Sequence, residues 1–170
     1  MEVRRRSVPP IVVAVLDSDP DTTELLKSYL EIEGIVVATG SLLDFRLGKA
    51  DLIEFLKRTA PDVILFDLGL PYEANYVYLQ RVREDPAFPR SGFVVTTTNA
   101  RAVRDLVGIE ALEILGKPYD LSVLVTAVRA AAAELPLPWA RTEADRRLGD
   151  RRQGDRRVDA DSRAPGSATH

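Results

Sequence analysis

Polar side chains that could do chemistry follow four short apolar runs of this 170-residue chain. Carboxylates of this kind supply the oxygen ligands that a hard cation such as Mg²⁺ prefers. A nearby ammonium and hydroxyl could bind the oxygens of an anionic group. Together these types predict transfer of a phosphoryl group to a carboxylate, because charge stabilisation is most of that catalytic work. The side chains are Asp17, Ser18, Asp19, Asp67, Thr96, Thr97, Thr98 and Lys117.

The apolar runs themselves predict strands, since they are continuous rather than alternating, as in a sheet covered on both faces. Helix-like segments separate them, and strand and helix alternate five times. This pattern predicts an α/β fold, a doubly wound five-stranded parallel sheet with helices on both faces. Residues 41–48 fit neither pattern and are expected to form an irregular loop. The expected strands are residues 11–16, 35–39, 63–66, 93–97 and 111–115, and the expected helices are 20–33, 49–59, 75–85, 100–107 and one beginning near 120.

Composition divides the chain into three parts. Residues 11–135 are rich in Val, Leu, Ile and Ala and are expected to form one domain, preceded by an extension over residues 1–10. Residues 136–170 are dominated by Arg and Asp, and such a tail is expected to be disordered. The net charge of −3 does not favour a protein that coats nucleic acid. No apolar run is long enough to span a membrane, and we expect a cytoplasmic location.

Four stretches of the chain resemble the motifs of a known family, and they occur in the same order and at similar spacing. Residues 11–135 are similar to the response-regulator receiver domain, the phosphoacceptor half of a two-component system. The resemblance implies the strand order 2-1-3-4-5. The matching stretches are residues 13–20, 61–71, 94–97 and 115–120, which read VAVLDSDP, PDVILFDLGLP, VVTT and LGKPYD.

The resemblance also assigns roles to individual residues. Asp67 matches the phosphoacceptor, and Lys117 matches the lysine that pairs with the acceptor and its phosphoryl group. Thr97 matches the hydroxyl residue at the site, with Thr96 as the alternative. The implied Mg²⁺ ligands are Asp17, Asp67 and the backbone carbonyl of Gly69.

Two positions depart from the family pattern. Ser18 stands where the family has the second carboxylate of an acidic pair, and a neutral hydroxyl should weaken Mg²⁺ binding. Ile114 stands where the family has an aromatic residue that rotates on phosphorylation. These departures keep a second hypothesis open, a pseudo-receiver that binds a partner without phosphotransfer.

The leading hypothesis is a single-domain response regulator that accepts a phosphoryl group on Asp67 from a histidine kinase or a phosphotransfer protein. The donor must be another protein, because the sole histidine is His170. The expected output is contact with a downstream protein, since no DNA-binding domain follows, and a homodimer is left open. Beyond its own phosphorylation and dephosphorylation, no enzymatic activity is expected. A hydrolase of the haloacid dehalogenase type ranks low, since it usually needs a second Asp where Gly69 stands.

Overall fold

A computed structural model describes residues 9–86, 91–107 and 113–134 of the chain. Most of the predicted extension over residues 1–10 and all of the predicted tail over residues 136–170 lie outside the described residues. Those two predictions, and the domain boundaries that depend on them, therefore stay predictions.

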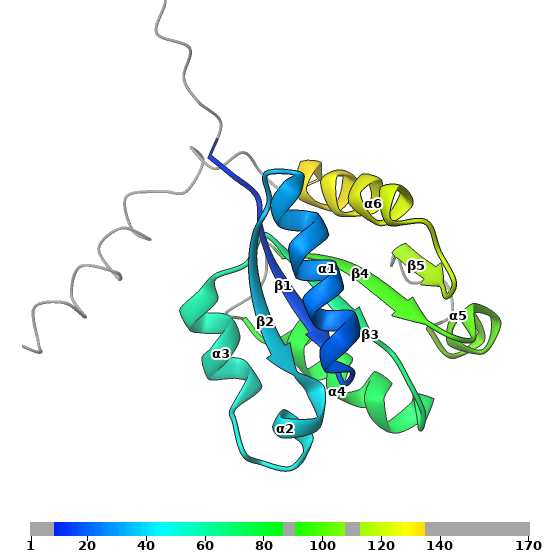
Figure 1. Cartoon of the computed structure of the whole chain (residues 1–170). Coiled ribbons are helices and arrows are strands. Elements are labelled where there is room, and N and C mark those ends of the chain that lie inside the picture. The colour runs from blue at the N-terminus through cyan, green and yellow to red at the C-terminus, as the bar shows by residue number, and fades with distance from the viewer. Residues whose placement is uncertain (1–8, 87–90, 108–112, 135–170) are drawn as a thin grey trace, which may run out of the picture. The chain divides into compact units, whose positions relative to one another are not determined.

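Five parallel strands form the sheet, in the order β2-β1-β3-β4-β5 (Figure 1). Both the fold class and the strand order predicted from the sequence are confirmed. Because all neighbours are parallel, the carboxyl ends of the strands share one edge of the sheet, and Asp17, Asp67 and Thr97 are the last residues of their strands. The strands are β1 (Val12–Asp17), β2 (Val36–Ser41), β3 (Val63–Asp67), β4 (Gly92–Thr97) and β5 (Glu113–Gly116).

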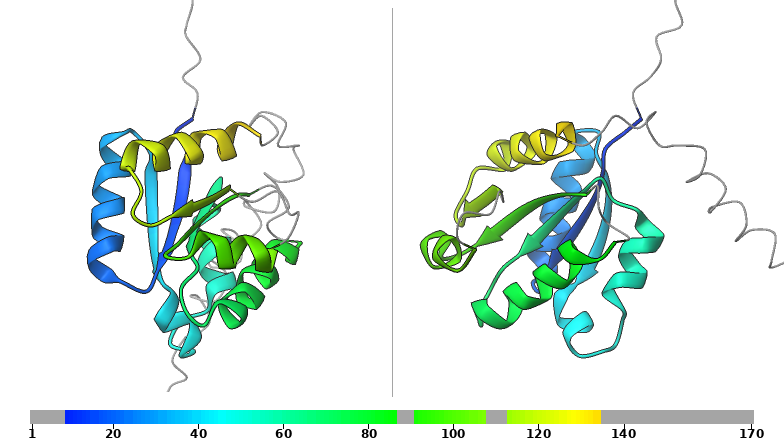
Figure 2. Two further views of the ribbon diagram at one scale, coloured as in Figure 1. Left: turned by 90° about the vertical axis from the view of Figure 1, so that its right-hand side faces the viewer. Right: turned by 180° about the vertical axis from the view of Figure 1, so that it is seen from behind.

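Helices cover both faces of this sheet, as Figures 1 and 2 show. One face packs on α1 and α6, through a cluster that includes Leu30 and Leu124, and the other packs on α2 to α5, through a cluster that includes Leu56 and Leu79. Each such leucine, once buried, contributes about 2 kcal/mol of hydrophobic free energy. The helices are α1 (Pro20–Ile32), α2 (Leu42–Arg46), α3 (Leu52–Thr59), α4 (Tyr72–Glu84), α5 (Ala100–Val107) and α6 (Leu121–Ala133).

The two central strands are the rigid support of the sheet edge. In β1 and β3, residues 13–16 and 63–66 are buried to 1% exposure or less, because helices cover both faces. Asp17 and Asp67 follow these buried segments directly, so their carboxylates are attached to a rigid backbone.

Three helices differ from the sequence expectation. The expected loop over residues 41–48 contains the short helix α2, whose N-terminus is capped by the Ser41 hydroxyl, which accepts from the Asp44 N–H at 3.2 Å. Phe45 of this helix is buried and lies so close to Gly40 that a Cβ there would come within 2.7 Å of the ring. Two other helices begin three residues away from the expected start: α3 begins at Leu52 rather than residue 49, and α4 begins at Tyr72 rather than near residue 75. No helix in the described ranges is long and apolar enough to cross a membrane.

Candidate functional site

Asp67 is the centre of a polar cluster at the carboxyl edge of the sheet. Its side chain is 17% exposed, and its Oδ1 lies 2.8 Å from the Nζ of Lys117, which follows β5. The hydroxyl of Thr96 donates to the same Oδ1 at 3.0 Å. Within the described part of the chain, Oδ2 of Asp67 accepts no hydrogen bond. One carboxylate oxygen is thus held by a cation and a hydroxyl, and the other is open to a ligand.

The hydroxyl beside Asp67 belongs to Thr96 and not to Thr97, which corrects the sequence prediction. The register pairs Asp67 with Thr96 across β3 and β4. Since successive side chains of a strand point to opposite faces, Thr97 must face away from Asp67. Its fully buried hydroxyl accepts from the N–H of Asn99 at 3.2 Å and so has a structural partner of its own.

Asp17 brings a second carboxylate to the cluster from the end of β1. It is only 3% exposed, its Oδ1 accepts from the N–H of Asp19 at 2.9 Å, and its Oδ2 lies 3.5 Å from Lys117 Nζ. Burial raises the pKa of Asp17, and the charge of Asp67 raises it further, against the backbone hydrogen bond and Lys117, which lower it. Two carboxylates therefore share one ammonium.

Lys117 is the cation shared by the two carboxylates, and its pKa reflects both its burial and their charges. Burial disfavours its charged form, but the hydrogen bond and the charges of Asp67 and Asp17 outweigh burial and raise its pKa. The lysine is therefore cationic at neutral pH and tied to both carboxylates. The structure thus brings together Asp17, Asp67 and Lys117, as the strand-end argument predicts.

Neither residue that follows Asp17 supplies another carboxylate to the cluster. Ser18 is exposed. The carboxylate of Asp19 caps α1 instead: it accepts from the N–H groups of Asp21 and Thr22 at 2.9 and 3.4 Å, and from the Thr22 hydroxyl at 3.2 Å. These backbone hydrogen bonds lower the pKa of Asp19. The missing carboxylate at position 18 is therefore not replaced from position 19.

Two further residues of the cluster were missed by sequence reasoning. Asn75 of α4 is 9% exposed, and its Nδ2 donates to the carbonyl oxygen of Gly69 at 2.8 Å. Tyr119, two residues after Lys117, is half-buried close to the charges of Lys117, Asp67 and Asp17, and burial raises its pKa. A signal for Asn75 was present, because asparagine is a weak helix former that needs a local reason inside a helix.

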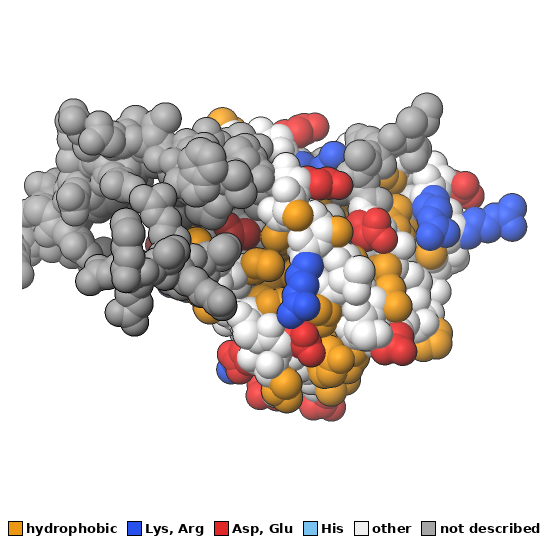
Figure 3. All heavy atoms as spheres, turned by 90° about the horizontal axis from the view of Figure 1, so that it is seen from above, with side chains coloured by type: hydrophobic (Ala, Val, Ile, Leu, Met, Phe, Trp, Pro, Cys, Tyr) orange, Lys and Arg blue, Asp and Glu red, His pale blue; other side chains and the backbone are white. Residues whose placement is uncertain are grey.

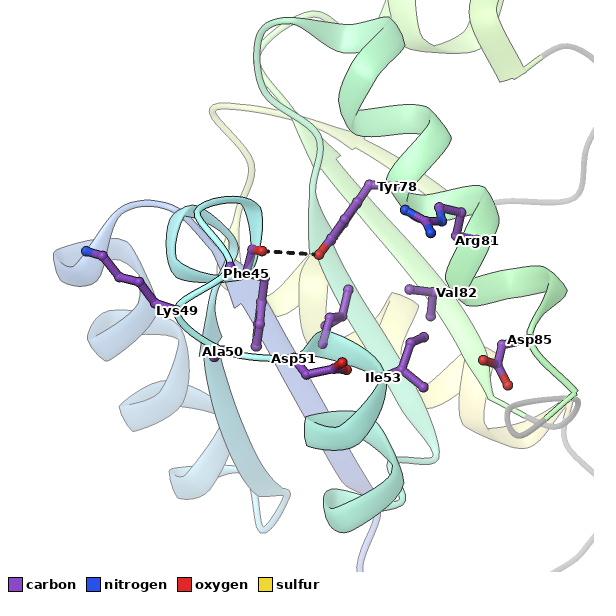
Figure 4. Close-up of a pocket in the computed structure, with 11 residues that line it drawn as sticks. Phe45, Lys49, Ala50, Asp51, Ile53, Tyr78, Arg81, Val82 and Asp85 are labelled. Atoms are coloured by element: carbon purple, nitrogen blue, oxygen red, sulfur yellow. Dashed lines mark hydrogen bonds between the residues drawn. The ribbon is translucent and has the colours of Figure 1, made fainter.

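A pocket of about 580 Å³ lies elsewhere, between the start of α3 and the last turns of α4 (Figure 4). Its walls include the rings of Phe45 and Tyr78, and the Tyr78 hydroxyl donates to the Phe45 carbonyl at 3.4 Å. Lys49, Arg81, Asp51 and Asp85 also line it, so both signs of charge are present. None of the Asp67 cluster lines this pocket.

Residues 13–129 match the family model described as the response regulator receiver domain, which spans more than half of the chain. This chain belongs to the receiver family. In that family the general function is phosphorylation of an aspartate by a kinase, and receivers generally bind Mg²⁺ in the acidic pocket.

The relatives of this receiver differ in the fraction of their own length that this chain matches. An uncharacterised 14.6 kDa protein of Leptolyngbya boryana is 26% identical, over 73% of this chain and 92% of the relative. Response regulator Rre1 of Synechocystis is 27% identical over 71% of this chain and 51% of the relative. The transcriptional regulatory protein TrcR of Mycobacterium tuberculosis is 28% identical over 75% of this chain and 47% of the relative. The chain thus spans about half the length of these two regulators.

Solved structures support the same fold. A response regulator receiver protein from Sinorhizobium medicae is 25% identical with a TM-score of 0.59, over 75% of this chain and 98% of that one. A sensor protein from Polaromonas is 22% identical with a TM-score of 0.62, over 75% of this chain and all of the other. The latter likeness concerns the fold only.

The receiver site of this chain fits a divalent cation with a reduced set of donors. Two carboxylates, at Asp17 and Asp67, face one ammonium and leave one negative charge unbalanced. In proteins Mg²⁺ is usually bound by one or two carboxylates and keeps several water molecules. Within the described ranges no group of three or more acidic, histidine or cysteine residues forms a denser cluster. The residues that would hold Mg²⁺ are Asp17, Asp67 and, through its carbonyl, Gly69.

Proposed function

We propose that Asp67 accepts a phosphoryl group from the phosphohistidine of a histidine kinase or a phosphotransfer protein. The observation that carries the proposal is the unequal use of its two oxygens. Lys117 and Thr96 both bind Oδ1, while Oδ2 has no hydrogen-bond donor in the described part of the chain. A carboxylate held in this way is oriented and still able to react.

The transfer is a displacement at phosphorus. A carboxylate oxygen of Asp67 forms the new P–O bond while the P–N bond to the donor imidazole breaks, and the electron pair of that bond stays on the imidazole nitrogen. The ammonium of Lys117 lies within reach of the negative charge on the phosphoryl oxygens, and Thr96 can donate to one of them. Mg²⁺, when bound, offsets further charge on the same oxygens. We propose no enzymatic activity beyond this phosphorylation and its hydrolytic reversal.

Phosphorylation can be tested without the cognate kinase. The full chain is incubated with acetyl phosphate and Mg²⁺, and its intact mass is followed over time. We expect a gain of one phosphoryl group in the wild type and in Asp21→Asn, an exposed carboxylate of α1 that lies outside the cluster. We expect no gain in Asp67→Asn. A gain that persists in Asp67→Asn, or its absence from the wild type, would overturn the proposal.

The pseudo-receiver remains the second candidate, and a specific observation favours it. Ser18 brings no charge, Asp19 is committed to capping α1, and the Gly69 carbonyl already accepts from Asn75. A chain that never uses Mg²⁺ would show no mass gain with or without EDTA. Its affinity for the partner would also be the same in Asp67→Asn as in the wild type. In a receiver that uses phosphorylation, Asp67→Asn would instead abolish the change in partner affinity that phosphorylation causes.

The output of the site is proposed to be contact with a downstream protein. Leu70, in the loop that follows Asp67, is 75% exposed, so this loop offers an apolar side chain to a partner. Figure 3 shows the side of the molecule away from the carboxyl ends of β1 and β2, and there acidic, basic and hydrophobic side chains of the described residues are interspersed rather than sorted by sign. A mixed surface of this kind suits protein contacts better than a nucleic-acid backbone, which selects a basic field. The identity of the partner and a homodimeric state stay proposals.

A further inference from the structure

Asn75 occupies an unusual place for an amide side chain. It is the fourth residue of α4 and is 9% exposed. Asparagine is a poor helix former, and burying an amide is costly unless the amide is hydrogen-bonded. Its Nδ2 donates to the carbonyl oxygen of Gly69 at 2.8 Å, six residues back along the chain. The side chain therefore ties the helix to the loop that follows the acceptor aspartate.

That loop has few other restraints near Gly69. Its first residue, Leu68, is anchored by its N–H to the carbonyl of Thr96 at 2.7 Å. At Gly69 a Cβ would meet only Oδ2 of Asp67, at 3.9 Å, so no side chain packs closely on that side. The hydrogen bond from Asn75 is thus a principal restraint on where the Gly69 carbonyl points.

We propose that Asn75 is a positioning residue that weakens Mg²⁺ binding by holding the Gly69 carbonyl oxygen. The inference rests on the function proposed for Asp67, because the cation belongs to that site. Mg²⁺ requires near-ideal octahedral geometry and is unforgiving of ligands held in other directions. The amide uses one of the two lone pairs of the carbonyl oxygen and restrains its direction, so a cation must take the other lone pair in the geometry that Asn75 imposes, in competition with that hydrogen bond. With Ser18 neutral, the carbonyl is one of few donors left, and the competition has a large effect.

Magnesium titration of the full chain by calorimetry tests this role directly. We expect Asn75→Ala to bind Mg²⁺ roughly three- to tenfold more tightly than the wild type, the worth of one hydrogen bond. Asn75→Leu, which removes the amide but keeps a similar volume, should behave likewise and covers the case in which the alanine variant fails to fold. Asn99→Ala is the matched control, because Asn99 accepts from the Ala102 N–H at 3.1 Å outside the acceptor loop. It should bind Mg²⁺ as the wild type does.

Unchanged or weaker binding in both Asn75 variants would overturn the inference, and so would undetectable binding in all variants. Unfolding curves recorded in EDTA confirm that each variant is folded. The acetyl phosphate experiment on the wild type is independent of this titration. A wild type that gains a phosphoryl group while the Asn75 variants show no gain in affinity leaves the proposed function standing. Absence of the mass gain would count against the function at Asp67.

Discussion

Thr96 and Asp67 face each other across β3 and β4, and the Thr96 hydroxyl donates to Oδ1 of the aspartate at 3.0 Å. The next residue, Thr97, points to the opposite side of the sheet and accepts from the N–H of Asn99. Two adjacent, buried threonines thus have different hydrogen-bond partners. They form a matched pair in which one hydroxyl serves the candidate site and the other serves the backbone.

Thr96→Val should slow phosphorylation of Asp67 by acetyl phosphate. Valine keeps the shape of threonine but removes the hydroxyl that orients the carboxylate and can donate to a phosphoryl oxygen. A hydrogen bond to a charged group is worth about 1.5–3 kcal/mol, so we expect a loss of roughly tenfold or more in rate. The rate of mass gain measures it, and a rate equal to the wild type would contradict the role given to Thr96.

Thr97→Val should have the complementary effect. The N–H of Asn99 loses its acceptor, so the free energy of unfolding should fall by about 1 kcal/mol. Phosphorylation of the folded fraction should keep the wild-type rate, because this hydroxyl does not reach Asp67. Urea denaturation and the mass assay give the two values. If Thr97→Val slowed phosphorylation and Thr96→Val did not, the site hydroxyl would belong to Thr97 instead of Thr96.

Asp17 makes the stability depend on pH in a predictable direction. Its pKa is raised on folding, first by burial and then by Asp67, so its ionised form opposes folding. That cost is present above the folded-state pKa, declines as the pH falls through it, and is gone below the unfolded pKa. In EDTA at pH 7, Asp17→Asn should therefore be more stable than the wild type. The advantage should shrink as the pH is lowered toward 4.

Urea unfolding at a series of pH values tests this dependence. The asparagine Oδ1 can still accept from the Asp19 N–H, and Lys117 loses the charge of Asp17 at 3.5 Å but keeps that of Asp67 at 2.8 Å. Asp21→Asn is again the control, since its carboxylate is exposed. A stability difference that is constant with pH, or that favours the wild type at pH 7, would refute the assignment of a raised pKa to Asp17.

The fold was predictable because its signal is local and repeated. Continuous apolar runs between amphipathic segments indicate buried parallel strands, and parallel strands place Asp17, Asp67 and Lys117 at one edge without any knowledge of contacts. The position of the hydroxyl was not predictable in the same way. Choosing between Thr96 and Thr97 requires the register of β4 against β3, and a shift of one residue reverses which side chain faces the site.

The remaining errors come from contacts that a residue makes outside its own helix. The five residues of α2 are too few to show a helical period, and Phe45 packs on Gly40 and the sheet rather than on its own segment. Asn75 appeared to be a helix-starting residue, but its amide binds backward to the Gly69 carbonyl. Only the folded loop shows that partner. Local patterns therefore predicted which residues meet at the site, and the structure supplied their hydrogen-bond partners.

Gly92 should tolerate no side chain, whereas Gly69 should accept one. A Cβ at Gly92, the first residue of β4, would lie 2.8 Å from the carbonyl oxygen of Ala131 and 3.0 Å from its carbonyl carbon, both in the backbone of α6. Backbone atoms of a packed helix cannot move aside as a flexible side chain can. Gly92→Ala should therefore displace α6 and cost about 1–3 kcal/mol of unfolding free energy, as overpacking usually does.

Gly69→Ala is the matched substitution, because the nearest atom to its Cβ would be Oδ2 of Asp67 at an ordinary 3.9 Å. Among the described glycines, positive φ values occur at Gly34 and Gly48, so neither substitution meets a left-handed backbone. The difference in unfolding free energy between the two variants thus measures the steric cost of a Cβ against α6. Urea denaturation in EDTA should place Gly69→Ala within about 0.5 kcal/mol of the wild type and Gly92→Ala well below it. Equal stabilities would mean that α6 does not pack as closely on β4 as the structure has it.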